Sequence, residues 1–233
     1  MTRPSGPPAA RAALLLLADG RFPAGGHAHS GGAEAAVADG RIRDAATLAD
    51  FCRGRLHTTG LVAAALAAAA TTGLDPLAHD EAADARTPAP AQRAVSRRQG
   101  RQLLRAARAA WPDPALDRLA ADRPRGAHQP IVLGITARAA GLGPLDAAHA
   151  ALYESASGPA TAAVRLLSLD PFHAAAVLAR LAPEIDAVAE AAARAAERAA
   201  AEGSAAALPA ASAPLLDIAA EHHAAWPVRL FAS

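Results

Sequence analysis

Alanine dominates the apolar residues of this chain, and this composition constrains its fold more than any other feature. Hydrophobic residues make up 52% of the 233 residues, whereas aromatic residues make up only 3%. Alanine is the strongest helix former, and its small side chain lets helices pack closely. No stretch alternates the β-branched and aromatic residues that strands favour. The sequence therefore predicts an all-α protein.

Proline and glycine stand between the alanine- and leucine-rich runs, where helices are expected to end. They divide the chain into a disordered tail at residues 1–8, a single-domain helical bundle at 9–202 and a flexible C-terminal tail at 203–233. We expect about 8–10 helices. The longer ones should lie near residues 9–18, 30–39, 44–72, 92–110, 131–140, 144–169 and 171–201, with shorter pieces within 77–91 and at 215–223. Residues 111–130 contain four prolines and are expected to be irregular.

The chain contains no lysine, so all 23 basic residues are arginine. A side-chain Schiff base therefore cannot form, and a phosphate-binding loop ending in Gly-Lys-Ser/Thr is absent. Cys52 is the only cysteine and cannot form an internal disulfide. No apolar run is long enough to span a bilayer. We therefore expect a cytoplasmic protein that does not bind membranes.

Residues 22–34, FPAGGHAHSGGAE, are richer in special residues than a connection between two helices requires. Pro23 fixes one backbone dihedral, and Gly25 permits a sharp turn or a close backbone approach. Ser30 is placed to cap the helix that carries Glu34. An ordinary connection between helices is the alternative interpretation.

Two histidine pairs raise the question of a metal site. His27 and His29 form a His-x-His pair, which is a weak signal because metal sites usually use three or four ligands. His222 and His223 are adjacent and would point to different sides of a helix. We expect no metal at these residues and favour structural or surface roles. A helical metalloenzyme is the alternative, and it predicts bound metal in the purified protein.

Arginines recur at helical spacing within residues 92–110. They stand at Arg93, Arg97, Arg101, Arg105 and Arg108 and so line one helix face. The wider region from 86 to 125 holds ten arginines against three aspartates. Such a patch fits an acidic protein or a phosphate backbone, which makes a helical nucleic-acid-binding regulator the alternative function. A solvated face balanced by acidic residues elsewhere is the other interpretation. A protein partner is favoured because no stacking aromatic residues accompany the arginines.

The last residues of the chain are unusually apolar for a tail. Trp226, Leu230 and Phe231 stand beside Arg229 in the final eight residues. Disordered tails tend to avoid such side chains. Docking on the chain's own core or on a partner protein would explain them.

Four segments together resemble the family of the urease accessory protein UreF. Residues 15–34 are similar to the N-terminal signature of that family, with Pro23, Gly25, Ser30, Gly32 and Glu34 at matching positions. The signature's two aromatic residues are replaced here by His27 and His29. The other matching segments are SRRQGRQLL at 96–104, AAVRL at 162–166 and RLFAS at 229–233. They follow in the family's order from about residue 14 to the end of the chain.

The resemblance implies an all-α homodimer that is not an enzyme. It implies binding to the accessory protein UreD (also called UreH), to the GTPase UreG and to apo-urease, into which that complex inserts nickel as GTP is hydrolysed. No cofactor would be bound directly, because GTP and nickel would be handled by the partners. We expect Arg229, Leu230 and Phe231 to become ordered on the UreD-like partner. The turn and Arg165 would shape the surface that meets the GTPase or a second copy of the chain, and a nickel passage would lie near His27 or His29.

The complete set of residues expected to bind partners combines the turn, the arginine face and the tail. It comprises Pro23, Gly25, His27, His29, Ser30, Glu34, Arg97, Arg101, Arg165, Arg229, Leu230 and Phe231.

Overall fold

A computed structural model describes residues 10–232 of the chain. The described residues form helices and no strand, which confirms the all-α prediction. The expected disordered segment at residues 1–8 and the terminal Ser233 lie outside the described residues. None of the helices in the described range is both long enough and apolar enough to cross a membrane.

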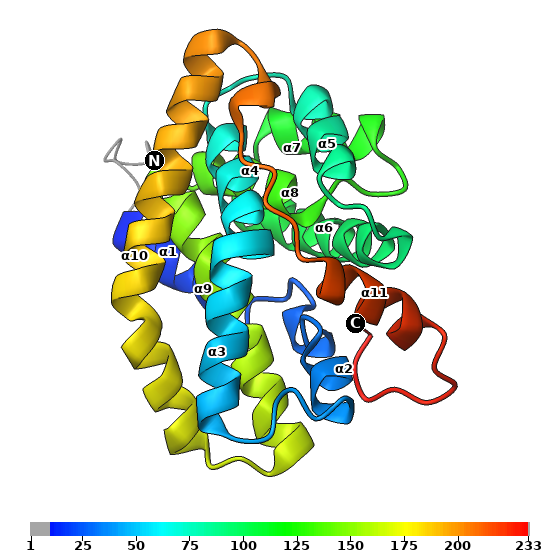
Figure 1. The fold of residues 1–233 in the computed structure, drawn as a ribbon. Coiled ribbons are helices and arrows are strands. Elements are labelled where there is room, and N and C mark those ends of the chain that lie inside the picture. The colour runs from blue at the N-terminus through cyan, green and yellow to red at the C-terminus, as the bar shows by residue number, and fades with distance from the viewer. Residues whose placement is uncertain (1–9, 233) are drawn as a thin grey trace.

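The described residues contain eleven α-helices. A π-helical turn joins α3 directly to α4, so these two form one continuous helix (Figure 1). The α-helices are α1 Ala10–Ala18, α2 Ala33–Ala38, α3 Ala45–Arg55, α4 Leu61–Thr71, α5 Pro76–Ala85, α6 Pro90–Ala110, α7 Pro114–Asp122, α8 Gln129–Ala139, α9 Pro144–Leu167, α10 Pro171–Glu202 and α11 Pro214–Ala224. The π-helical turn is Leu56–Gly60, and short 3-10 turns lie at Gly26–Ala28 and Ala205–Ala207.

Helix starts follow the Asp-Pro pairs of the sequence. Asp75, Asp113 and Asp170 each precede a proline, and each side chain accepts a hydrogen bond from a backbone N–H in the first turn. Proline fits there because the first helical residues need no N–H donor. The prediction that residues 111–130 are irregular was wrong, since Asp113 caps α7 within them. The prolines of this region were interpreted as breakers, although Pro114 begins a helix.

Helix α3 begins with a capping box between Asp44 and Thr47. The Thr47 N–H donates to Asp44 Oδ1 at 2.8 Å, and the Asp44 N–H donates to Thr47 Oγ1 at 3.1 Å. This start agrees with the lower bound of the helix expected at residues 44–72.

Alanine fills the centre of the bundle. Helix α4 is buried from Ala64 to Thr71 and packs against α8, α9 and α10. A Cβ added at Gly134 of α8 would overlap the Ala67 carbonyl oxygen of α4, so these two backbones are in direct contact. Close backbone approach of this kind needs small residues, which explains why a core with few large side chains is well packed.

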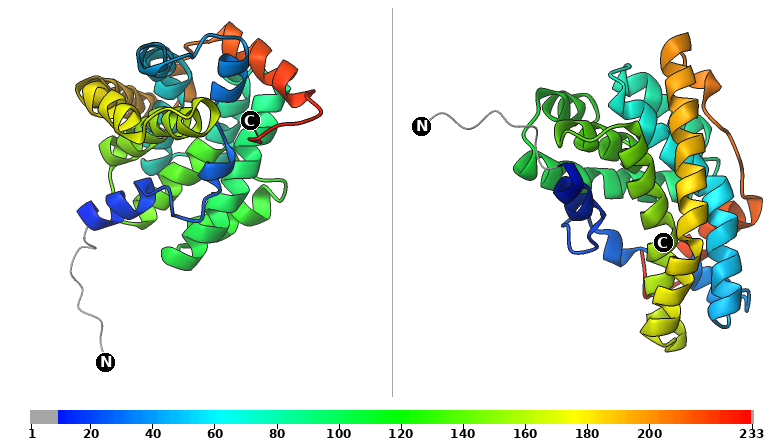
Figure 2. Two further views of the ribbon diagram at one scale, coloured as in Figure 1. Left: turned by 90° about the horizontal axis from the view of Figure 1, so that it is seen from below. Right: turned by 90° about the vertical axis from the view of Figure 1, so that its left-hand side faces the viewer.

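Helix α10 runs along one side of the molecule and covers α3, α4 and α9, while α5 to α8 form the opposite side (Figures 1 and 2). Residues 203–213 then lead back to α11, which packs on α6 and α2. Arg86 holds this connection by donating to the carbonyls of Ala205, Leu208 and Pro209 at 2.8–3.0 Å. The expected tail boundary coincides with the end of α10, but the segment beyond it lies against the bundle.

Candidate functional site

The glycine-rich stretch at residues 22–34, called here the signature turn, makes the sharp turn that its glycines predict. The predicted cap at Ser30 was wrong in position, because Gly32 is the N-cap of α2, which begins at Ala33. Gly25, Gly31 and Gly32 have φ values of +80°, +60° and +87°, which only glycine adopts without strain. Ser30 is buried, and its Oγ accepts from the Glu34 N–H at 3.2 Å. Ser30 therefore helps to begin α2, and Glu34 is fixed in the first turn of that helix.

Glu34 joins the signature turn to the C-terminal tail. Its buried carboxylate accepts from the backbone N–H groups of Leu230 at 2.8 Å and Phe231 at 3.0 Å. His223 Nε2 lies 2.8 Å from the same carboxylate. Burial alone would raise the pKa of Glu34, but the hydrogen bonds from Leu230, His223 and Phe231 outweigh it and hold that pKa below its usual value. Glu34 is therefore stabilised in its charged form by groups nearly 200 residues away.

The tail makes further contacts with the turn and with α9. The Ala232 N–H donates to the Ala28 carbonyl at 2.7 Å, in the 3-10 turn of the signature. Phe231 is 4% exposed, and the Arg165 guanidinium lies 5.0 Å from its ring centre. The sequence left open docking on the chain's own core or on a partner, and within one chain the structure shows the first. Ordering of the tail on a partner stays a prediction.

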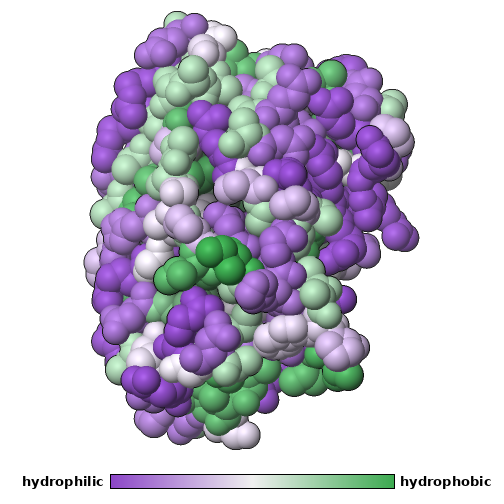
Figure 3. Space-filling view, turned by 45° about the vertical axis from the view of Figure 1, so that its right-hand side comes forward, coloured by the Kyte–Doolittle hydropathy of each residue, from purple (hydrophilic) through white to green (hydrophobic). Residues whose placement is uncertain are grey.

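The same contacts leave other tail residues facing solvent. Val228 is 83% exposed and Leu230 66% exposed, and Arg229 between them is also exposed. Leu215 and Ile218 of α11 add two more exposed apolar side chains. Figure 3 shows separate apolar patches among hydrophilic residues on one face of the molecule. The turn and the tail thus present a mixed surface, called here the turn–tail surface.

A hollow of about 550 Å³ lies beside the turn and the tail, lined in part by Arg55, Arg98, Gln129 and Glu154. Glu154 is exposed to solvent, but it lines this concave site and is surrounded by many protein atoms. That burial raises its pKa, although Gln129 Nε2 donates to its carboxylate at 2.7 Å.

Among the described residues, the histidines of the signature turn belong to no cluster of three or more potential metal ligands. His27 is exposed, with its ring against Gly20, and His29 is partly buried. Burial, helped by the nearby Arg98, lowers the pKa of His29 to about 4. Within residues 10–232, no group of three or more His, Cys, Asp or Glu side chains is placed to hold a metal ion. His223 of the second pair is turned toward Glu34 instead.

The arginine face of α6 makes contacts within the protein, with acidic residues at two positions and with backbone carbonyls at two others. Arg97 forms ion pairs with Asp80 at 3.1 Å and Asp84 at 2.5 Å. Arg93 donates to the Thr87 and Pro88 carbonyls, Arg101 donates to the Arg125 carbonyl, and Arg108 pairs with Asp117. The excess of arginine over residues 86–125 does not include the acidic residues of α5, because they precede that region. Acidic neighbours therefore balance Arg97 and Arg108, as one interpretation of the sequence held, whereas binding of a partner at Arg97 and Arg101 stays a prediction.

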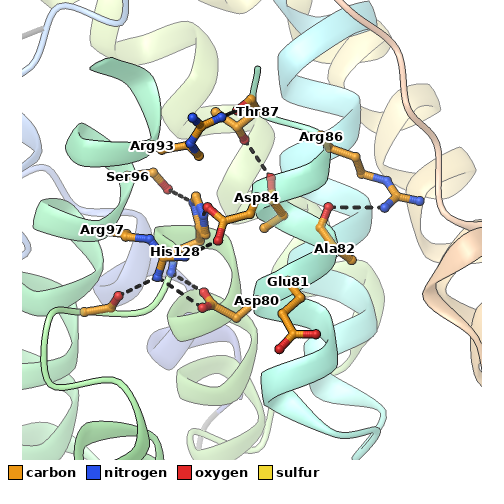
Figure 4. Close-up of polar contacts among 12 residues, drawn as sticks. Asp80, Glu81, Ala82, Asp84, Arg86, Thr87, Arg93, Ser96, Arg97 and His128 are labelled. Carbon is orange, nitrogen blue, oxygen red and sulfur yellow. Dashed lines mark hydrogen bonds and ion pairs between the residues drawn. The ribbon is translucent and has the colours of Figure 1, made fainter. Parts of the chain in front are cut away.

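Asp80 and Asp84 of α5 form the centre of a polar cluster that the sequence did not reveal (Figure 4). Asp80 is fully buried and accepts from Arg97, from Arg123 Nε at 2.9 Å and from the His128 N–H at 2.7 Å. His128 is buried as well, and its Nε2 lies 2.8 Å from Asp84 Oδ1. Burial lowers the pKa of His128, so the imidazole tends to be neutral here. The available signal was the four-residue spacing of the two aspartates opposite an arginine-rich helix.

The single cysteine belongs to the core. Cys52 is buried, its Sγ lies 3.7 Å from the Ala156 carbonyl oxygen, and burial raises its pKa to about 11. A thiol of that pKa is not a reactive nucleophile at neutral pH.

Fold and site together define a class: an all-α protein in which the C-terminal tail and a glycine-rich N-terminal turn form one surface. The sequence pattern of the UreF family matches residues 42–182, more than half of the chain. Urease accessory protein UreF of Mycolicibacterium vanbaalenii is 45% identical, with 95% of this chain and 98% of the relative covered. UreF of Mycobacterium sp. (strain JLS) is also 45% identical over 94% and 97%, and that of Mycobacterium tuberculosis 42% identical over 91% and 93%. The chain belongs to the UreF family of urease accessory proteins.

Proposed function

We propose that this protein is a non-catalytic scaffold in urease maturation. It joins a UreD/UreH-like accessory protein to a UreG-like GTPase while nickel is inserted into apo-urease in a GTP-dependent step. Membership of the UreF family supports the role in urease maturation. GTP and nickel are handled by the partners, the protein acts in the cytoplasm as a homodimer, and binding to the GTPase modulates it.

The observation that carries the proposal is the junction at Glu34. One carboxylate unites the signature turn and the tail, so residues from the two ends of the chain form a single surface. Exposed apolar groups beside an exposed arginine, as at Val228, Arg229 and Leu230, are suited to binding a protein. The hollow beside this surface, with His29 and Glu154 near it, is where we place a passage for nickel between partners.

Co-purification tests the scaffold. The wild-type chain is expected to retain the UreD-like and UreG-like proteins of the same genome, and Leu230→Ala is expected to reduce retention at least about tenfold. Phe172→Ala is the matched control, because Phe172 is also a large exposed apolar side chain (83%) but lies at the start of α10. A wild-type chain that retains neither partner would refute the proposal. Salt-sensitive binding of duplex DNA by the wild type would instead favour a nucleic-acid-binding regulator.

A further inference from the structure

Helix α9 contains a proline in its interior, and this proline leaves a backbone carbonyl without its helical donor. Pro159 has no N–H, so the carbonyl of Ser155 four residues earlier cannot accept the usual helical hydrogen bond. A carbonyl left in this way needs another donor.

Arg55 supplies that donor from the end of α3. Its Nε donates to the Ser155 carbonyl at 3.1 Å, and its Nη2 donates to the Ser155 hydroxyl at 3.4 Å. The remaining side of the guanidinium reaches the signature turn, where Nη1 donates to the Gly31 carbonyl at 2.8 Å. One side chain therefore holds the break in α9 and the signature turn at the same time.

Two glycines allow these elements to come so close. A Cβ at Gly31 would lie 3.4 Å from both the Arg55 guanidinium carbon and Pro159 Cγ, so the turn packs directly on both residues. A Cβ at Gly60 would lie 3.0 Å from Ser155 Oγ of α9, so a side chain at this position would crowd that helix. Gly60 ends the π-helical turn that directly follows Arg55, and such turns often occur at functional sites.

We infer that Arg55 is a positioning residue: it fixes the signature turn against the proline break of α9 and thereby sets the shape of the turn–tail surface. This inference rests on the proposed function, because that surface is where we place the partners. Since Glu34 lies three residues after Gly31, a shift of the turn carries Glu34 with it. The tail amides of Leu230 and Phe231, which donate to Glu34, then report the position of the turn.

The simultaneous contacts with Gly31 and Ser155 require the forked guanidinium group of arginine. Arginine presents donors in fixed directions and can hold Gly31 and Ser155 together, whereas the single ammonium of lysine is a point charge. Arg55→Lys therefore keeps the charge and removes the double contact. Arg53→Lys is the matched control, because Arg53 lies two residues earlier, is exposed, and pairs with Asp50 and Glu184 away from the turn.

Hydrogen exchange of the full-length protein, followed by partner capture, tests the inference. Arg55→Lys is expected to speed exchange of the Glu34, Leu230 and Phe231 amides about tenfold, with amides of α4 unchanged, and to weaken capture of the UreD-like protein by a similar factor. Arg53→Lys should change neither. Unchanged exchange at the three amides overturns the inference, and so does faster exchange with undiminished capture.

A second variant covers the case in which Arg55→Lys does not fold. Pro159→Ala leaves Arg55 intact but returns an N–H that competes with Arg55 Nε for the Ser155 carbonyl, and it removes the ring against which Gly31 packs. Both changes weaken the hold of α9 on the signature turn. Faster exchange of the same three amides supports the inference, and wild-type exchange overturns it. If the wild type captures no partner, the proposed function fails. The hydrogen-exchange result then decides by itself whether Arg55 positions the turn.

Discussion

Two buried carboxylates of this protein each accept several hydrogen bonds, but they connect different parts of the fold. Asp80 accepts from two guanidiniums and one backbone N–H, all supplied by residues 17–48 positions away in the neighbouring α6 and the segment between α7 and α8. Glu34 accepts from two backbone N–H groups and a histidine that are 189–197 positions away on the tail.

This difference indicates which part of the fold can detach from the helical bundle. Asp80 is enclosed by helices that also bury apolar side chains, so its loss should affect the whole bundle. Glu34 ties down residues 224–232, in which Phe231 is the one buried side chain. Few buried contacts and a terminal position give a segment low local stability. We conclude that Asp80 stabilises the frame, whereas Glu34 positions a surface on it.

The largest effect is expected from Asp80→Asn. Removing the charge takes from Arg97 and Arg123 their ion pairs with a buried carboxylate, and Arg123 keeps only its longer pair with the exposed Glu81 at 3.6 Å. The loss should lower the free energy of unfolding by about 3 kcal/mol. Chemical denaturation measures this loss. Asp50→Asn, which removes an exposed pair with Arg53, should change the same quantity by less than about 1 kcal/mol. Equal effects of the two variants would contradict the role assigned to Asp80.

A smaller and more local effect is expected from Glu34→Gln. The amide can accept hydrogen bonds at only one atom, so the tail should lose about 1–3 kcal/mol of local stability. Limited proteolysis after residue 224 should become faster, while the denaturation midpoint of the bundle changes little. A bundle destabilised as much as by Asp80→Asn would remove the distinction between the two carboxylates.

Acidification should release the tail before the bundle unfolds. The pKa of Glu34 is lower in the folded chain than its usual 4.5, so the charged carboxylate stabilises the docked tail above pH 4.5. That stabilisation is lost as the pH falls through the lower, folded value. Trp226, whose ring lies 4.8 Å from that of His223, reports this change by fluorescence in a Trp111→Phe background. The transition should be absent from Glu34→Gln, and its persistence there would assign it to another group.

The smallest effect is expected from Arg165→Ala. Arg165 is exposed, and its contact with the Phe231 ring should be worth about 0.5–1 kcal/mol to tail docking. Exchange of the Phe231 amide measures it against the wild type. A loss greater than that of Glu34→Gln would make the ring contact, and not the carboxylate, the main attachment of the tail.

Much of the fold could be predicted because its signals are local. Alanine- and leucine-rich runs, and the prolines and glycines between them, placed most helices. Ser30 was expected to cap the second helix, but α2 begins at Ala33 with Gly32 as its N-cap. Helix α7 was missed because Pro114 was interpreted as a breaker when it follows a capping aspartate.

The site could be predicted only in part, because its partners are distant in sequence. The turn and the tail were each identified as unusual, but nothing local indicates that Glu34 meets His223 and the amide of Phe231. Asp80 appeared to be one more acidic residue of a surface helix, although it is completely buried. The excess of arginine is a sum along the sequence, whereas the ion pairs form between different helices.

Capture of the purified UreD-like protein by folded Glu34→Gln, compared with the wild type, tests the central claim most directly. If the turn and the tail must be held together to form one binding surface, the variant should bind at least about tenfold more weakly while retaining the wild-type denaturation midpoint. Binding as tight as that of the wild type, or tighter, would contradict the account.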